Sequence, residues 1–286
     1  MADIKSTNSV ALGFRKLAAL MAPIAISLVA LGCSDETESN ASADLAGKSF
    51  VLVHGAWNGA WVWSDVAKQL EARGASVTSV DLLAHGDDMT PISETSLTKN
   101  AEQVRAAVEA AKSPVILVGH SFGGAVISQA AEARPKNLDR LIYLAAFIPA
   151  NGESVLDLVQ TDADSALAPV LQIDAEQGIA RVPMENLDAI FCADCKDPEL
   201  ALLDAKYRDE PLGPAAEKLT LTSDGFGSIP KSYIYTSQDR VISPGLQQSM
   251  SARVPLTRTA TLNTSHSPFL STPADLVATL ADFSKD

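Results

Sequence analysis

Short apolar runs alternate along the chain with longer stretches in which apolar residues recur at helical spacing. Three of the runs are followed directly by His, Asp or Gly, and a short uninterrupted apolar run such as 49–53 is typical of a strand buried on both faces of a sheet. They predict strands at 49–53, 76–80, 115–118, 141–144, 230–236 and 257–262. The spaced stretches predict helices at 61–72, 96–112, 122–133, 244–252 and 272–284. Repeated strand–helix units predict an α/β fold, with a mostly parallel, doubly wound sheet covered by helices on both faces.

This alternation is interrupted at about 149–218. The segment is too long for a simple connection between neighbouring elements, so we expect an insertion there. Insertions beside the ligand-binding edge of such a sheet often cover the pocket, and we therefore predict a helical lid.

The first part of the chain has the pattern of an export signal. Lys5, Arg15 and Lys16 precede an uncharged, apolar stretch at 17–34 that closes with small residues. The end of the stretch resembles a bacterial lipoprotein signal, in which Cys33 becomes the lipidated residue. A plain cleavable signal, a single membrane anchor and a buried core helix are the alternatives. The polar run directly after Cys33 argues against the core helix.

The chain is accordingly divided into three parts. Residues 1–33 are the lipoprotein-like signal, 34–46 a flexible tether and 47–286 the folded domain. The expected location is outside the cytoplasm, either anchored by lipid in a bacterial cell envelope, in the periplasm or secreted.

A candidate nucleophile follows the third predicted strand. The strand runs into a G-x-S-x-G motif at 119–123 and then directly into a helix. In this arrangement the serine occupies a strained turn, and the glycines let strand and helix approach closely. The turn would present Ser121 at the carboxyl edge of the sheet, where open parallel sheets bind ligands.

A serine hydroxyl is a weak nucleophile without a base, and His266 follows the last predicted strand. Asp239 follows the preceding strand and is placed to orient the imidazole. The order Ser, Asp, His along the chain is that of the α/β-hydrolases rather than of chymotrypsin or subtilisin. A solvated loop histidine and a surface turn at Asp239 are the alternatives. We expect structural rather than catalytic roles for the other three histidines. His54 ends the first strand, His85 lies in a loop, and His120 precedes the serine in a tight turn that should point its side chain elsewhere.

An oxyanion formed during acyl transfer needs backbone donors. We expect these to be the N–H groups of Phe122 and of Ala56, which lies in the loop after the first strand. The residues expected around the substrate pocket are Gly55, Trp57, Phe147, Met184 and Phe191. For the lid residues among them, packing of the lid onto the core is an equally good explanation.

Five segments resemble one known family; they are 50–63, 81–88, 119–124, 237–240 and 264–269. The family comprises α/β-hydrolases that include plant methylesterases, hydroxynitrile lyases and bacterial esterases. The resemblance extends over about 48–284 and is weakest in the insertion. It implies the α/β-hydrolase fold, a triad of Ser121, Asp239 and His266, and oxyanion donors at Ala56 and Phe122.

Two departures separate the chain from the lyases of this family. Hydroxynitrile lyases carry a threonine where this chain has Gly55, and a lysine where it has Ser267. The threonine binds the cyanohydrin hydroxyl and the lysine stabilises departing cyanide, whereas ester hydrolysis needs neither. The resemblance therefore favours an esterase.

The charge and cysteine content of the chain limit the kinds of partner and cofactor that we expect. A net charge of −13 is unfavourable for binding nucleic acid or an anionic membrane, so we expect membrane contact only through a lipid on Cys33. Cys192 and Cys195 form a C-x-x-C pair, and the sequence does not decide whether they form a disulfide or remain two free thiols. No metal or organic cofactor is expected, because the nucleophile, base and oxyanion donors are all protein groups.

The sequence thus predicts a serine carboxylesterase that cleaves small to medium neutral esters through an acyl-enzyme. Its partner would be a small-molecule ester, and its oligomeric state is open. The alternatives are another α/β-hydrolase reaction (amide, lactone, carbonate or C–C hydrolysis, or hydroxynitrile lyase), a non-catalytic ligand-binding module and an envelope-anchored structural lipoprotein. The complete triad argues against the last two.

Overall fold

The computed structural model describes residues 44–285. The predicted signal with Cys33 and most of the predicted tether lie outside the described residues. The tether ends earlier than predicted, because Leu45 is only 1% exposed and its backbone N–H donates to the carbonyl of Arg73. Burial of one leucine side chain stabilises a fold by about 1.5–3 kcal/mol, so the folded domain begins before residue 46.

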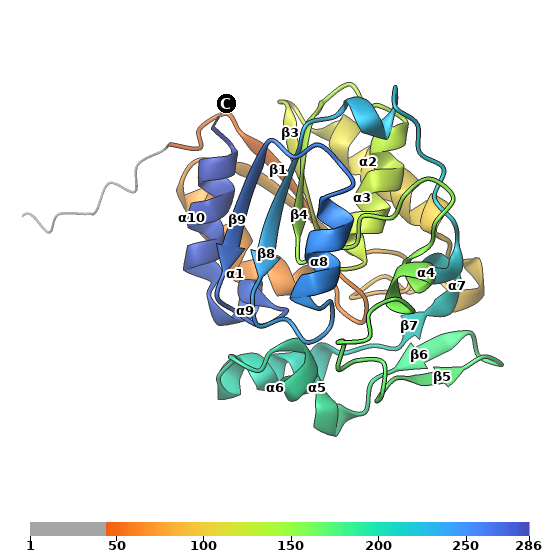
Figure 1. Ribbon diagram of the computed structural model, residues 1–286. Coiled ribbons are helices and arrows are strands. Elements are labelled where there is room, and N and C mark those ends of the chain that lie inside the picture. The colour runs from red at the N-terminus through yellow and green to blue at the C-terminus, as the bar shows by residue number, and fades with distance from the viewer. Residues whose placement is uncertain (1–43, 286) are drawn as a thin grey trace, which may run out of the picture. The chain divides into compact units, whose positions relative to one another are not determined.

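Six parallel strands form one sheet in the order β2-β1-β3-β4-β8-β9 (Figure 1). They are β1 (Ser49–Val53), β2 (Ser76–Val80), β3 (Val115–His120), β4 (Leu138–Leu144), β8 (Lys231–Thr236) and β9 (Arg258–Leu262). All six predicted strands are present, with limits that differ by a few residues. The direction of winding changes between β1 and β3, which pair in register from Ser49 to Val53. In open parallel sheets, ligands bind outside the carboxyl ends of the strands at such a switch point.

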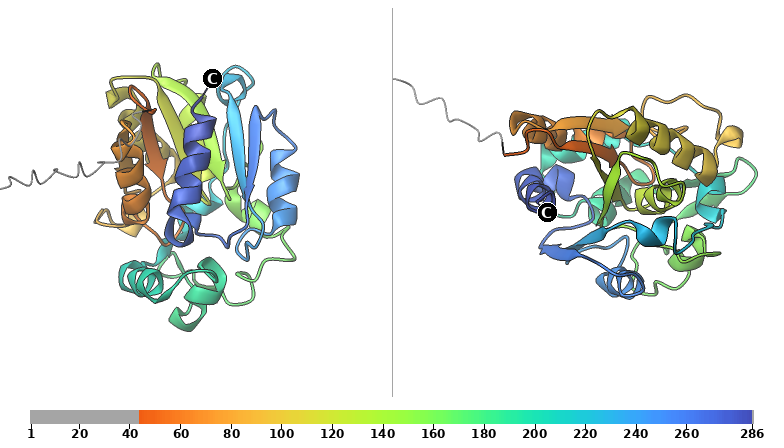
Figure 2. Two further views of the ribbon diagram at one scale, coloured as in Figure 1. Left: turned by 90° about the vertical axis from the view of Figure 1, so that its left-hand side faces the viewer. Right: turned by 90° about the horizontal axis from the view of Figure 1, so that it is seen from above.

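Helices cover both faces of the sheet (Figures 1 and 2), and alternate residues of a strand pack against opposite layers. Val51 and Val53 belong to one apolar core, whereas Phe50 and Leu52 belong to the other. The first core includes α2 (Leu97–Ala110), α3 (Gly123–Glu132) and α8 (Pro244–Ser251), and the second includes α1 (Ser64–Ala72) and α10 (Pro273–Phe283). Burial on both faces explains why the central strands β1 and β3 appear in the sequence as apolar runs, whereas the edge strands β2 and β9 are only half buried.

The insertion between β4 and β8 lies at one end of the sheet and is not only helical (Figure 1). Its helices are α4 (Val155–Val159), α5 (Met184–Phe191), α6 (Asp197–Lys206) and α7 (Leu212–Ala216). A small antiparallel sheet joins β5 (Gln172–Asp174), β6 (Ile179–Arg181) and β7 (Glu210–Pro211). The predicted helical insertion thus also contains a small sheet, which was not predicted because strands this short leave no alternating run in the sequence.

Four short helices complete the main domain: η1 (Ala60–Trp63), η2 (Ile92–Glu94), η3 (Phe226–Ser228) and α9 (Pro268–Ser271). Within residues 44–285, no helix has the length and apolar character required to cross a bilayer.

Candidate active site

Ser121 occupies a strained turn between β3 and α3. Its φ is +53°, the left-handed region that costs a non-glycine residue about 1–3 kcal/mol. The glycines around it permit the close approach of strand and helix. A Cβ on Gly119 would lie 2.7 Å from the carbonyl oxygen of Gly123, and one on Gly123 would lie 2.6 Å from that of His54. The strained backbone and the glycines together fit the nucleophile turn expected from the motif.

His266 and Asp239 meet in the loops after β9 and β8. Nδ1 of His266 lies 2.8 Å from Oδ2 of Asp239, and both side chains are buried. An ionised carboxylate only accepts hydrogen bonds, so Nδ1 carries the proton and donates it. This tautomer leaves Nε2 of His266 with a lone pair, which is what a general base requires.

The carboxylate of Asp239 is fixed by a dense hydrogen-bond network. Oδ1 accepts from the backbone N–H groups of Val241 and Ile242 at 2.8 and 3.0 Å. Oδ2 accepts from the Thr236 hydroxyl at 2.8 Å and from the Gln247 amide at 3.1 Å. The sequence analysis did not identify Gln247, because no local pattern connects helix α8 with the loop that contains Asp239.

His120 links the turn at Ser121 with the loop of His266. Its Nε2 lies 3.0 Å from the carbonyl oxygen of His266 and donates to it, and the two imidazole rings are 4.5 Å apart. Burial and the neighbouring His266 ring lower the pKa of His120 well below its usual value, so His120 is neutral. The proposed base therefore lies against the residue that directly precedes Ser121.

Ala56 and Phe122, the expected oxyanion donors, line the same pocket as Ser121. Neither backbone N–H donates to a backbone carbonyl within residues 44–285, so both are free to bind an oxyanion. Gly55 lies behind Ser121, since a Cβ at this position would be 2.7 Å from Cβ of Ser121 and 2.8 Å from Nδ1 of His120. Glycine is thus the residue that this close packing accommodates.

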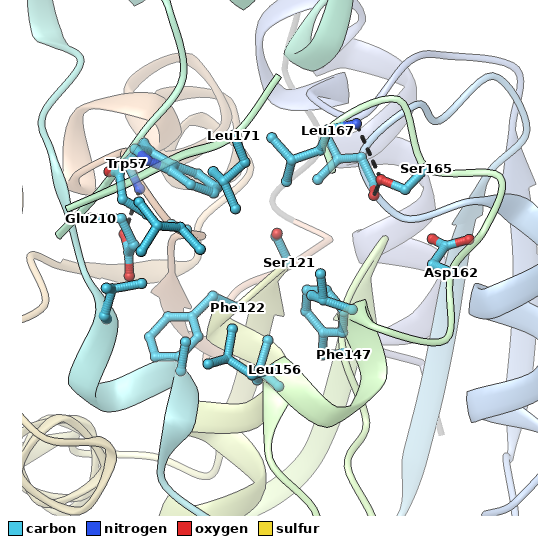
Figure 3. A pocket seen from close by; sticks show the side chains of 18 of the residues that line it. Trp57, Ser121, Phe122, Phe147, Leu156, Asp162, Ser165, Leu167, Leu171 and Glu210 are labelled. Carbon is cyan, nitrogen blue, oxygen red and sulfur yellow. Dashed lines mark hydrogen bonds between the residues drawn. The ribbon is translucent and has the colours of Figure 1, made fainter. Parts of the chain in front are cut away.

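An apolar cavity opens beside Ser121 (Figure 3). The space within its walls is about 720 Å³ when space open to solvent is included. Trp57 and Phe147 line it as predicted, and the insertion contributes apolar walls that include Leu156 and Leu171.

Three of the predicted pocket residues, Gly55, Met184 and Phe191, do not line the cavity. Met184, at the first position of α5, is 47% exposed, so the prediction that it forms a pocket wall is wrong. Phe191 is buried behind Trp57, with their ring centroids 5.4 Å apart. Phe191 therefore supports a wall of the cavity rather than forming one. This agrees with the alternative that lid residues pack the lid onto the core.

A buried carboxylate that the sequence analysis missed also borders the cavity (Figure 3). Oε2 of Glu210 lies 2.7 Å from Nε2 of His85 and accepts from the backbone N–H of Trp57, also at 2.7 Å. Burial opposes protonation of His85, but attraction to Glu210 and their hydrogen bond outweigh it and raise the pKa of His85. No sequence signal marks Glu210, because it joins His85 only through the folding of the insertion.

Cys192 and Cys195, which follow α5, are joined by a disulfide. Sγ of Cys192 contacts the carbonyl oxygen of Ser267 at 3.9 Å. The pair is therefore situated beside the loop that contains His266.

Comparison with known proteins identifies the family. The model of the alpha/beta hydrolase family matches residues 50–280. Putative methylesterase 11 of Arabidopsis thaliana is 32% identical over 263 residues, which cover 85% of this chain and 65% of the relative. Methylesterase 7 of Arabidopsis thaliana is 30% identical over 82% of this chain and 95% of the relative. The chain thus spans less than two thirds of putative methylesterase 11, but nearly all of methylesterase 7.

Solved structures agree with this assignment. A pyrethroid hydrolase from Sphingobium faniae JZ-2 has a TM-score of 0.73 and 26% identity, covering 83% of this chain and 97% of that one. Polyneuridine aldehyde esterase shares the fold, with a TM-score of 0.74 and 23% identity over 83% of this chain and 99% of that one. Because the family model covers well over half of its length, the chain belongs to the alpha/beta hydrolase family.

Proposed function

We propose that the protein is a serine carboxylesterase that hydrolyses small to medium neutral carboxylic esters through an acyl-enzyme intermediate. The observation that carries this proposal is the buried hydrogen bond between Asp239 and His266, which leaves Nε2 unprotonated in a ring that packs against His120, the residue before the strained turn of Ser121. Esterases among the relatives support the reaction class, and the name of methylesterase 7 favours methyl esters among the substrates.

The reaction follows from the roles of these groups. Nε2 of His266 takes the hydroxyl proton as Oγ of Ser121 bonds to the ester carbonyl carbon. The carbonyl oxygen becomes an oxyanion, to which the N–H groups of Ala56 and Phe122 donate. When the intermediate collapses, the alcohol leaves with the proton from His266 and the acyl group stays on Ser121.

Deacylation repeats these steps with water. His266 takes a proton from the water molecule whose oxygen attacks the acyl carbon, and the oxyanion forms at the same donors. Collapse releases the carboxylic acid and returns the proton to Oγ of Ser121, which restores the free enzyme.

The walls of the cavity favour neutral, apolar ester groups. Each buried CH₂ group contributes about 0.8 kcal/mol to binding, so Trp57, Phe147 and Leu156 are suited to aliphatic or aromatic parts of the substrate. The net charge of −13 disfavours anionic esters at low salt.

Hydrolysis of p-nitrophenyl butyrate tests the proposal. The wild-type protein should release a burst of p-nitrophenol, and a fluorophosphonate probe should label Ser121, as located by peptide mass spectrometry. Ser121→Ala should abolish both with an unchanged circular dichroism spectrum. Ser237→Ala, which removes an exposed serine outside the site, is the matched control and should behave as wild type. Hydrolysis that persists in a folded Ser121→Ala variant would exclude the mechanism.

A further inference from the structure

The insertion binds every hydrogen-bonding group of Trp57. The backbone N–H of Trp57 donates to Oε2 of Glu210 at 2.7 Å, and its carbonyl oxygen accepts from the N–H of Arg208 at 3.2 Å. Its indole N–H donates to the carbonyl oxygen of Ala180 at 3.0 Å. The loop after β1 is thus held by side-chain and backbone groups that lie far away in the sequence.

Trp57 needs such support because its backbone is strained. Its φ is +61°, in the left-handed region that is unfavourable for a non-glycine residue. Strained backbone persists only where surrounding contacts fix it. Trp57 directly follows Ala56, so the hydrogen bond from the Trp57 N–H to Glu210 fixes the peptide unit that joins the two residues and thereby restrains Ala56.

The acceptor for Trp57 is one half of a buried ion pair. The side chains of Glu210 and His85 are 5% and 0% exposed. Nδ1 of His85 lies 2.9 Å from the carbonyl oxygen of Leu83, and Nε2 lies 2.7 Å from the carboxylate. Both ring nitrogens face acceptors, so both carry protons and the imidazolium pairs with an ionised carboxylate. A charged acceptor forms roughly twice as strong a hydrogen bond with the Trp57 N–H as a neutral one.

Further contacts hold the ion pair within the fold. Nη1 of Arg208, which lies two residues before Glu210, donates to the carbonyl oxygens of Gly86 and Asp88 at 2.8 and 2.9 Å. The insertion strand that contains Glu210 is therefore fixed on the loop of His85 as well as on that of Trp57. Removing one partner of a buried ion pair leaves an uncompensated buried charge, so the fold strongly favours this arrangement.

We propose that Glu210 is a positioning residue for ester hydrolysis: with His85 it fixes the backbone at Trp57, and thereby aims the N–H of Ala56 at the developing oxyanion. This inference rests on the proposed esterase function. An oxyanion donor interacts with the transition state more strongly than with the ester ground state. Loss of Glu210 should therefore lower kcat and leave KM almost unchanged.

The test compares Glu210→Ala, Glu210→Gln and Glu217→Gln. Loss of one oxyanion donor lowers kcat by about 10²–10³-fold, and we expect about 100-fold for Glu210→Ala with KM changed by less than about threefold. The amide oxygen of Glu210→Gln still accepts from Trp57 but loses the charge, so about tenfold is expected. Glu217, another insertion carboxylate, accepts from the N–H of Leu97 away from the cavity, and Glu217→Gln should match wild type.

A second measurement separates positioning from a general loss of structure. An alkyl trifluoromethyl ketone forms an adduct on the serine with an oxyanion, whereas the matching alkyl methyl ketone binds mainly as a neutral ligand. Affinity for the trifluoromethyl ketone should fall by about the same factor as kcat, and affinity for the methyl ketone should stay constant. Equal weakening of both ketones, or wild-type kcat in the two Glu210 variants, would overturn the inference. Should Glu210→Ala not fold, Glu210→Gln alone decides between these outcomes.

Failure of the proposed function gives a different result. In that case the wild-type protein hydrolyses none of the esters, and neither it nor Ser121→Ala reacts with the fluorophosphonate. If hydrolysis depends on Ser121 but the Glu210 variants keep the wild-type kcat, only the positioning role of Glu210 is rejected.

Discussion

Asp194, between α5 and α6, accepts hydrogen bonds from the backbone N–H and the hydroxyl of Ser265, the residue before His266. The disulfide partner Cys192 contacts the carbonyl oxygen of Ser267, the residue after it. The insertion therefore holds the loop of the proposed base on both sides. It does so in addition to covering the cavity, which makes the geometry of His266 dependent on the insertion.

The contact from Asp194 leads to a first prediction. Hydrogen bonds to a charged group contribute about 1.5–3 kcal/mol, so Asp194→Ala should loosen the loop and lower kcat/KM for p-nitrophenyl butyrate about tenfold. Asp197→Asn alters an exposed carboxylate in the same segment and should leave kcat/KM unchanged. Equal kinetics for the two variants would show that Asp194 does not position His266.

The disulfide gives a second prediction. Closing a loop as short as Cys192–Cys195 stabilises a fold by about 2 kcal/mol in the chain-entropy model. Reduction should therefore lower Tm by about 4–8 °C for a domain of this size. Thermal unfolding followed by circular dichroism with and without a phosphine reductant measures the change. The double variant Cys192→Ser, Cys195→Ser should melt like the reduced protein, and its Tm should not change with reductant. A change of Tm in this variant would show that the reductant does not act through this disulfide.

Much of the fold and the proposed triad could be predicted because the signals are local. A strand such as 49–53 is a continuous apolar run, since helices bury both of its faces. Ser121, Asp239 and His266 each follow a strand, and the carboxyl ends of parallel strands meet at one edge of the sheet. Sequence order and strand prediction therefore sufficed to select them as candidates.

The missed residues depend on contacts between distant segments. Glu210 meets His85 across 125 positions, and Asp194 meets Ser265 across 71. Nothing near these carboxylates distinguishes them from solvated ones, because their partners are defined only by the fold of the insertion. The error at Met184 has the same origin, since burial of a residue at a helix start depends on what packs there.

Gly124 supports a third prediction. A Cβ at this position would lie 2.4 Å from the carbonyl oxygen of Phe147, so the backbone that carries this pocket wall would have to move. Such overpacking costs about 1–3 kcal/mol, and we expect Gly124→Ala to lower the free energy of unfolding by this amount and to reduce kcat/KM. Urea unfolding and ester hydrolysis measure the two effects.

Gly213 provides the matched control for Gly124. The nearest atom to a Cβ there is 3.9 Å away, and Gly213 lies within helix α7. Gly213→Ala should therefore be neutral or stabilising by up to about 1 kcal/mol. A Gly124→Ala variant as stable as Gly213→Ala would contradict the close packing at the turn of Ser121.

Buried histidines give the last prediction, a maximum of stability near pH 6.5. Burial, with a smaller effect of the neighbouring His85, lowers the pKa of His54 to about 3, and burial also lowers that of His120. Below pH 6.5 the unfolded chain takes up protons at both residues while the folded protein does not, so stability falls as the pH falls. Two such groups give a slope of up to about 2–3 kcal/mol per pH unit between pH 6.5 and 5.

The alkaline side of this maximum depends on His85. Because the pairing with Glu210 raises the pKa of His85, the folded protein keeps this proton above pH 6.5 while the unfolded chain loses it. Stability therefore also falls as the pH rises from 6.5 through the raised pKa of His85. Urea unfolding at pH 5 to 8 measures both sides, because the lowered pKa of Lys231, about 8, makes stability rise with pH above that value. His54→Gln should reduce the acid slope by about half while leaving the alkaline side intact. Because carboxylates in the unfolded chain titrate mainly below about pH 5, an unfolding free energy that is constant from pH 6.5 to 5 would mean that His54 and His120 are not buried in the neutral form.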